Sequence, residues 1–312
     1  MERNGTGVLS LDGFIDVDNY RYVYFVFFVA MYVVIVCSNC IIIYVIRIHR
    51  NLHEPMYIFI AALSLNSLLF STTIYPKLIV DVLSHQQSVS YSVCLLQVYV
   101  FYSVAAADLM LLSGMAYDRY VSICKPLQYV SLMGKTRVCI FLGLAWFLPA
   151  CHVSVSVIIR SKQKLCSFSS GGIFCNSAIA KIHCSTPTSL IVLGFIVIIN
   201  MAVIPVLFIL FTYIKIFAVA FGSHGETRTK AIDTCLPHLI VLILFSCLIV
   251  FDVIIGILET ELPKILRLII SLQILVWSPL FNPIIYGLKM KEISKHIKKF
   301  NSCCNHVEMI KK

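Results

Sequence analysis

Charge is scarce in this chain of 312 residues. Charged side chains make up 13% of the sequence and only 15 residues are acidic, whereas apolar residues make up 59% and the mean hydropathy is +0.91. A water-soluble protein carries about 25% charged and about 45–50% apolar residues. The charge is therefore too sparse to cover a soluble surface, which excludes a cytosolic enzyme, a nucleic-acid-binding domain and a disordered chain.

Long hydrophilic stretches and a cleavable leader are also missing. The longest loop between apolar runs, 160–189, has about thirty residues, which is too short for an attached catalytic domain. Met1–Asn19 has no apolar core, so we expect the first apolar run to target the chain and also to span the membrane. The scattered histidines form no metal pair on one helical face, and no serine, histidine and aspartate converge as a catalytic set. The sequence therefore predicts no enzyme and no metal site.

Seven apolar runs are each long enough to cross a bilayer, which takes about 20 mostly apolar residues in a helix. The predicted spans are Tyr22–Ile46, Met56–Val80, Leu95–Ile123, Val138–Ile159, Leu190–Ala220, Ala231–Gly256 and Leu266–Leu288. The sequence thus predicts an all-α membrane protein with a seven-transmembrane helix bundle. We divide it into an extracellular amino-terminal tail (1–21), the membrane domain (22–288), and a short cytosolic amphipathic eighth helix with the cytoplasmic tail (289–312).

The distribution of lysine and arginine predicts the orientation. An odd number of spans puts the two termini on opposite sides, and cytoplasmic loops carry the excess of basic residues. Most of the 25 lysines and arginines fall in the inner segments if the amino terminus lies outside. Asn4-Gly5-Thr6 is a glycosylation acceptor, which agrees with an outward Asn4.

The segment after the last span is amphipathic. Its apolar face is formed by Met290, Ile293, Ile297 and Phe300. Lysines occupy the opposite face, so we expect this helix to lie on an anionic lipid surface. Cys303 and Cys304 follow it and are either palmitoylation sites or plain juxtamembrane cysteines.

Four segments carry motifs in a characteristic order. They read LHEPMY at Leu52–Tyr57, MAYDRYVSICKPL at Met115–Leu127, KAIDTCLPH at Lys230–His238 and PLFNPIIY at Pro279–Tyr286. A bare Asp-Arg-Tyr at a membrane boundary is equally compatible with a routine interfacial salt bridge. Together the four motifs resemble those of odorant receptors of the rhodopsin-like G-protein-coupled receptor family, over nearly the whole chain. The proline in LPH and the Asn66-Ser67 pair are closer to fish-type odorant receptors.

This resemblance implies a function. An odorant receptor binds a small-molecule odorant from outside and activates a stimulatory heterotrimeric G protein of the cyclic-AMP pathway, at the plasma membrane and in sensory cilia. The residues that it implies for coupling and switching are Asp118, Arg119, Tyr120, Tyr213, His238, Asn282, Pro283 and Tyr286. We expect Asp118, Arg119 and His238 to lie on a mostly basic inner rim that receives the G protein.

A small-solute transporter or channel is the alternative function. Transporters of this size usually contain internal repeats and matched broken helices, and no repeat relates the two halves of this sequence. Channels need rings of charge or a filter sequence, and none is visible.

Four cysteines lie near the expected outer face. Cys94 opens the third span, and Cys166, Cys175 and Cys184 lie in the long loop. Disulfides persist in such an oxidising compartment, but four cysteines allow three pairings. The resemblance implies Cys94–Cys175 and Cys166–Cys184, which would hold the loop as a lid over the bundle.

Polar residues within the spans form a second group: Asn39, Ser67, Asp108 and Asn282. Receptors of this superfamily bind sodium there through an aspartate of the second helix, whose position is taken here by Ser67. We hypothesise that Asp108 replaces it, contacting Asn282 and binding a sodium ion or a proton. The alternative is a protonated Asp108 in a water-lined gap without an ion. No other cofactor is predicted.

An outward-opening ligand site is expected between the third, fifth, sixth and seventh spans. We expect its lining to be Phe101, Tyr102, Ala105, Ala106, Val197, Met201, Ile249 and Val253. Such apolar stripes are more often helix packing or lipid contact. Asp252 can bind an ammonium group or pair with Arg267 or Lys264. Amine receptors of the superfamily carry an aspartate where this chain has Phe101, which argues against a dedicated amine receptor.

Overall fold

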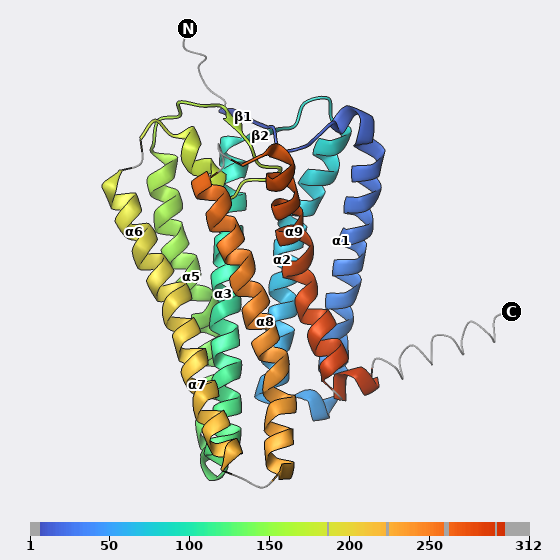
Figure 1. Cartoon of the computed structure of the whole chain (residues 1–312), viewed down its shortest axis with the longest axis vertical. Helices are drawn as coiled ribbons and strands as arrows, with labels where there is room; N and C mark the ends of the chain where they lie inside the picture. The colour runs from blue at the N-terminus through green and yellow to red at the C-terminus, as the bar shows by residue number, and fades with distance from the viewer. Residues whose placement is uncertain (1–6, 186, 223–224, 259–261, 291, 297–312) are drawn as a thin grey trace, which may run out of the picture.

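The chain is described here by a computed structural model, covering residues 7–185, 187–222, 225–258, 262–290 and 292–296. For 177–178, 225–234, 237, 253–258 and 288–289 only the backbone is described. Within these residues, seven long helices stand side by side in one bundle (Figure 1). The helices are α1 (Val17–Ile48), α2 (Pro55–Leu83), α3 (Tyr91–Cys124), α5 (Lys135–Ser161), the continuous run of α6 (Thr188–Ile198), η4 (Ile199–Val203) and α7 (Ile204–Phe221), α8 (Gly225–Leu258) and α9 (Lys264–Lys289).

Shorter elements join these helices. They are η1 (Arg50–Leu52), η2 (Pro126–Gln128), α4 (Tyr129–Leu132), η3 (Ser177–Ile182), a helical turn at 292–296 and the strands β1 (Val8–Leu11), β2 (Ser88–Ser90) and β3 (Ser169–Ser170). The strands lie at the upper end of the bundle in Figure 1 and the turn at 292–296 at the lower end. We call these the strand end and the turn end.

Most of the long helices have the length and composition of membrane spans. In the described part of the chain, six are apolar enough to cross a bilayer, counting α6 to α7 as one, and α8 contributes a shorter apolar segment, His238–Asp252. Many large apolar side chains, such as Phe195, Phe211 and Ile243, are exposed on the outside of the bundle. Exposure of this extent fits a surface that faces lipid rather than water.

The helices extend slightly beyond the predicted spans at both ends. Pro55 opens α2 at a position where its missing N–H costs no hydrogen bond. The hydroxyl of Ser90 accepts a bond from the N–H of Val93 (3.4 Å) and so caps α3. α1 begins at Val17, inside the segment assigned to the amino-terminal tail, because Asp18 in its first turn favours a helix amino terminus.

Part of the expected tail is folded. β1 is the central strand of a three-stranded sheet, antiparallel to β2 and parallel to β3. Leu9 and Leu11 point to the buried face of this strand, whereas Val8 and Ser10 are exposed. The segment before α1 is therefore clamped between the α2–α3 connection and the long loop.

The fifth span contains a π-helical turn. Pro205 has no N–H and cannot complete the regular bonding pattern, and the turn η4 immediately precedes this proline. π-helical turns are rare and often lie at functional sites. Met201, one of the expected ligand-site residues, lies in η4 and is buried. The sequence predicted a bend here but not its π-helical form.

Candidate functional site

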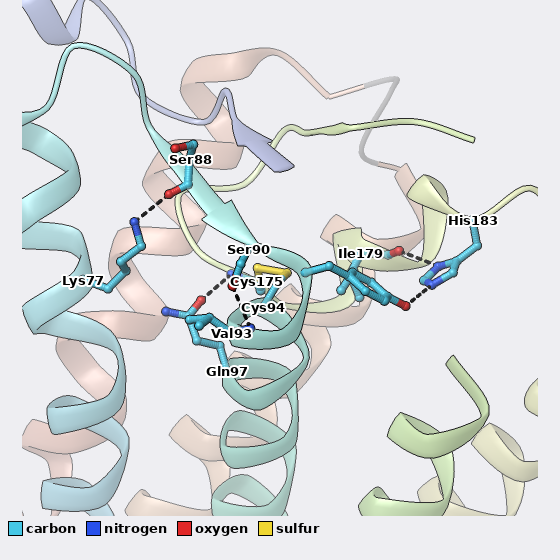
Figure 2. The surroundings of a disulfide bond; sticks show 10 residues. Lys77, Ser88, Ser90, Val93, Cys94, Gln97, Cys175, Ile179 and His183 are labelled. Atoms are coloured by element: carbon cyan, nitrogen blue, oxygen red, sulfur yellow. Dashed lines mark hydrogen bonds between the residues drawn. A yellow bond between two sulfur atoms is a disulfide. The ribbon is translucent and has the colours of Figure 1, made fainter. Parts of the chain in front are cut away.

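A disulfide fastens the long loop to the central helix at the strand end. Figure 2 shows Cys94, near the start of α3, bonded to Cys175 of the loop. The loop is also held by a hydrogen bond from the N–H of Cys175 to the Oε1 atom of Gln97 (3.3 Å). A second disulfide joins Cys166 to Cys184. The structure thus forms the two pairings that the resemblance implied.

We expect loss of the Cys94–Cys175 bond to deplete the protein from the cell surface. The bond closes a separation of 81 residues, which is worth about 4.5 kcal/mol in the chain-entropy description. Cys94→Ser, Cys175→Ser and the double variant break the same bond, so their surface levels should fall equally. Cys139→Ser removes an exposed free thiol and is the control. A double variant with the parent's surface level would contradict this prediction.

His183 anchors the far side of the same loop. Its Nδ1 atom lies 3.0 Å from the carbonyl oxygen of Ile179, as Figure 2 shows, and its Nε2 atom lies 2.9 Å from the hydroxyl of Tyr91. Burial and the nearby Arg160 lower the pKa of His183. The ring is therefore neutral at physiological pH.

The residues expected to line a ligand site lie below this loop. Phe101 is buried, with its ring centroid 5.7 Å from that of Phe174 in the loop. Tyr102, Ala105 and Ala106 are partly exposed although α3 is surrounded by other helices. The other expected residues are Met201, which is buried, Val197 and Ile249, which are partly buried, and Val253, whose side chain lies outside the described part of the structure.

Asp252 has partners that the sequence did not suggest. The hydroxyl of Tyr102 donates to its Oδ2 atom (2.8 Å), and the Nδ2 atom of Asn176 donates to Oδ1 (3.2 Å). These bonds connect α8, α3 and the loop, whereas we had considered only Arg267 and Lys264 as internal partners. The sequence did offer one sign of the Asn176 contact. Asn176 follows Cys175, and a disulfide from Cys175 to α3 brings Asn176 over the bundle.

Asp108 is bound differently from our hypothesis. Its Oδ1 atom accepts a hydrogen bond from the Nδ2 atom of Asn66 (3.0 Å), and the indole N–H of Trp146 donates to Oδ1 of Asn66 (2.7 Å). Asn282 instead donates to the hydroxyl of Ser67 (3.3 Å). In the described residues Asp108 and Asn282 thus bond to adjacent residues of α2, which point in directions about 100° apart, rather than to each other as we expected.

Asn39, like Ser67, forms a hydrogen bond to α9. Its Nδ2 atom donates to the carbonyl oxygens of Ile35 (2.9 Å) and Pro279 (3.0 Å). These bonds connect α1 to α9, whereas the Ser67–Asn282 bond connects α2 to α9. The buried polar residues thus hold the middle of the bundle together in two sets, one on either face of α2.

Asn66 is expected to be essential for the stability of the bundle. Asn66→Leu leaves the buried Asp108 carboxylate and the Trp146 N–H without their bridge, at a cost of about 2–5 kcal/mol. Ser246→Ala is the control, because this hydroxyl only bonds to a carbonyl of its own helix. The measurement is the thermal unfolding midpoint of the detergent-solubilised protein. Equal midpoints for the two variants would refute the bridging role.

A second network lies at the turn end of α3. Arg119 binds the Asp118 carboxylate through its Nη2 atom and through Nε (2.9 Å to Oδ2), and the hydroxyl of Tyr129 donates to Oδ1 (2.9 Å). Burial and the Asp118 carboxylate raise the pKa of Tyr129, so its hydroxyl stays protonated and donates. Three donor atoms, two from Arg119 of α3 and one from Tyr129 of α4, thus hold the Asp118 carboxylate.

The tyrosines and His238 lie deeper than expected. Tyr213 and Tyr286 are buried, and the hydroxyl of Tyr286 lies 3.3 Å from Nδ1 of His238. His238 is 2% exposed and Asp118 0%. Both residues therefore lie beneath the surface at the turn end, whereas we expected them on its rim. Tyr120 is partly exposed, with Lys125 over its ring.

Comparison with known proteins decides the family. The family model described as "Olfactory receptor" matches residues 28–303. The chain belongs to the olfactory receptor family. Olfactory receptor 11A1 of Homo sapiens is 33% identical over 291 residues, which cover 92% of this chain and 91% of that protein. Olfactory receptor 1 of Rattus norvegicus is 32% identical over 280 residues, covering 88% of each chain. Olfactory receptor 1J21 of Mus musculus is 32% identical over 298 residues, with 91% and 92% covered.

Family membership settles the class of protein. The olfactory receptor is a G-protein-coupled receptor of the plasma membrane with several spans, and it is not an enzyme. The alternative of a transporter or channel is not supported. Asn4, Cys303 and Cys304 lie outside the described residues.

Proposed function

We propose that this olfactory receptor binds a small odorant at the strand end of the bundle, below the long loop, and activates a stimulatory heterotrimeric G protein at the turn end. The receptor would thereby raise cyclic AMP in sensory cilia and serve the sense of smell. One observation carries the proposal. The same helix, α3, holds Tyr102 and the Cys94 disulfide near one end and the Asp118–Arg119 pair at the other.

Coupling between the ends requires two arrangements of the helices. An odorant can shift their balance only by binding one arrangement more tightly than the other. The π-helical turn before Pro205 and the two prolines inside α9 are sites where the helices can bend at low cost. In the second arrangement α8 leans away from α3, and Arg119 leaves Asp118 to contact the carboxyl-terminal helix of the G-protein α subunit.

A cyclic-AMP reporter tests this function directly. Cells expressing the receptor should respond to at least one member of a broad panel of odorants and amino acids, and Arg119→Ala should abolish the response while the receptor stays at the surface. In membranes, a guanine nucleotide should lower the affinity for the agonist. A transporter would accumulate the compound and ignore the nucleotide, and that result would reject the proposal.

The orientation is part of the proposal. The strand end with its two disulfides would face outside, Asn4 would be glycosylated, and the turn end would face the cytosol. At the turn end, Ile293 is buried and the ring of His296 lies 3.7 Å from that of His49, which supports a short eighth helix on the membrane surface. Cys303 and Cys304 would then follow this helix and be lipidated. Tags on both termini that are accessible from the same side of intact cells would exclude this orientation.

We further propose that Asp108 holds a sodium ion or a proton. Hard cations prefer oxygen ligands, and the buried Asp108 carboxylate supplies such oxygens beside Asn66. The Oδ1 atom of Asn39 is buried without a hydrogen-bond partner in the described structure, so it could accept a bond from a water molecule or bind a cation. Agonist affinity should depend on sodium in the parent and lose this dependence in Asp108→Asn. A parent receptor that ignores sodium would leave only the proton.

A further inference from the structure

Asp252 carries a carboxylate into the part of the bundle where an odorant would bind. It is 5% exposed, its Oδ2 atom accepts a hydrogen bond from Tyr102 of α3, and its Oδ1 atom accepts one from Asn176 beside the loop disulfide. Placing an ionised carboxylate within the span of a membrane protein is costly, so such a group is a functional site by default. A carboxylate offers about four acceptor positions, so it can bind several donors at once, a ligand N–H among them.

The ring of Tyr102, which adjoins this carboxylate, begins a row of aromatic side chains. The rings of Tyr102 and Phe101 are 5.0 Å apart between centroids, and that of Phe101 lies 5.7 Å from Phe174 and 5.8 Å from Phe70. The faces of aromatic rings attract cations, so a carboxylate with the ring of Tyr102 beside it and a row of further rings behind Tyr102 suits an ammonium group. A neutral odorant would gain binding affinity from contact with the rings, but it would gain none from the negative charge of Asp252.

Small side chains below Tyr102 leave room for the rest of a ligand. Ala105 and Ala106 lie one turn along α3 and are partly exposed, although α2, α5, α7 and α8 all contact this helix. Exposed surface on the central helix means that neighbouring side chains do not fill the space beside it. The carboxylate therefore lies at the polar end of a site whose remainder is apolar.

We propose that Asp252 is the specificity-determining residue of the odorant site and selects odorants that carry a protonated aliphatic amine. This inference rests on the proposed function. We argued above that Phe101, at the position where amine receptors carry an aspartate, speaks against an amine receptor. The structure revises that argument, because Asp252 of α8 brings a carboxylate next to this position, where it is bound by the hydroxyl of the adjacent Tyr102. The ammonium group would bind the Asp252 carboxylate, and its alkyl chain would extend toward Ala105 and Ala106.

Matched pairs of probes test this selectivity without any mutation. Hexylamine and hexanol share one skeleton, as do cyclohexylamine and cyclohexanol, so each pair isolates the charged group. In the parent receptor each amine should activate the cyclic-AMP reporter at a concentration at least about tenfold below that of its alcohol, as expected for a charged hydrogen bond. Alcohols that match or exceed their amines would overturn the inference and leave the proposed function intact.

Variants then assign the effect to Asp252. Asp252→Asn keeps the volume and an acceptor for Tyr102 but removes the charge, so it should weaken the amine at least about tenfold and leave the alcohol within about threefold. Asp252→Glu keeps the charge and should retain the preference for the amine. Surface levels are measured in parallel, and Tyr102→Phe serves as a second variant that should weaken the amine more than the alcohol.

Equal losses for amine and alcohol in these variants would assign Asp252 a purely structural role. A parent that answers no odorant at all, while present at the surface, would contradict the proposed function itself.

Discussion

Gly13→Ala is expected to remove most of the receptor from the cell surface. A Cβ atom at this position would lie 2.4 Å from the carbonyl carbon of Gly172 and 2.5 Å from the nitrogen of Ile173. Both are backbone atoms of the long loop, so no side-chain rotation can relieve the contact. Overpacking of this kind costs about 1–3 kcal/mol even where side chains can yield, and here the two segments must separate.

Separation at Gly13 would affect the whole strand end. Leu9 and Leu11 belong to the same apolar cluster as Cys94 and Cys175, and on the other side Phe14 packs its ring against Tyr24 and Phe28. Loss of this contact would therefore loosen the long loop above the proposed ligand site as well as the start of α1.

Gly143→Ala is the matched control for this prediction. Nothing lies within 4 Å of a Cβ atom at Gly143 in α5, so alanine should be neutral or gain up to about 1 kcal/mol through its higher helix propensity. The measurements are the surface level of a tagged receptor and its unfolding midpoint in detergent. If both variants behave alike, the close approach of residues 13 and 172 is absent in the folded receptor.

The seven spans could be predicted from the sequence because the bilayer fixes their length and composition. Tyr22–Ile46 and Leu266–Leu288, for example, fall within α1 and α9. The structure adds residues at the ends, where capping groups such as Ser90 decide the boundary rather than hydropathy. A hydropathy pattern does not contain that information, because polar caps lie outside the apolar run.

The strand β1 could not be predicted in the same way. Val8–Leu11 is a four-residue segment, and it pairs with Ser88–Ser90 and with Ser169–Ser170, which are far away in the sequence. Strands this short depend on their partners, and here the partners come from two different connections between helices.

Side-chain partners inside the bundle were the least predictable feature. Asn66 and Ser67 are neighbours, yet one bonds to Asp108 of α3 and the other to Asn282 of α9. Apolar periodicity places both residues on the inward side of α2, but it does not specify which neighbouring helix each one faces. Asp252 illustrates the same limit, because its partner Asn176 comes from a loop without periodicity.

Asp118→Asn should raise cyclic AMP in the absence of any odorant. Asp118 is fully buried and holds Arg119 through two nitrogen atoms, with Tyr129 on its other oxygen. Removing one partner of a buried ion pair costs about 3–5 kcal/mol. That cost falls on the arrangement described here, in which Arg119 is bound to Asp118, and not on the coupled arrangement in which Arg119 contacts the G protein. The balance therefore shifts toward the coupled state.

Two further variants show whether the ion pair itself sets the basal activity. Tyr129→Phe deletes one hydrogen bond to Asp118, worth about 0.5–1.5 kcal/mol, so its basal rise should be clearly smaller than that of Asp118→Asn. The double variant Asp118→Asn with Arg119→Ala should return to the parent's basal level or below, because the freed guanidinium is what the G protein would use. Basal cyclic AMP, divided by the surface level of each variant, is the measurement. If the double variant kept the high basal level, release of Arg119 would not be the activating event, and the buried carboxylate would act by holding α3 against α4 through Tyr129 alone.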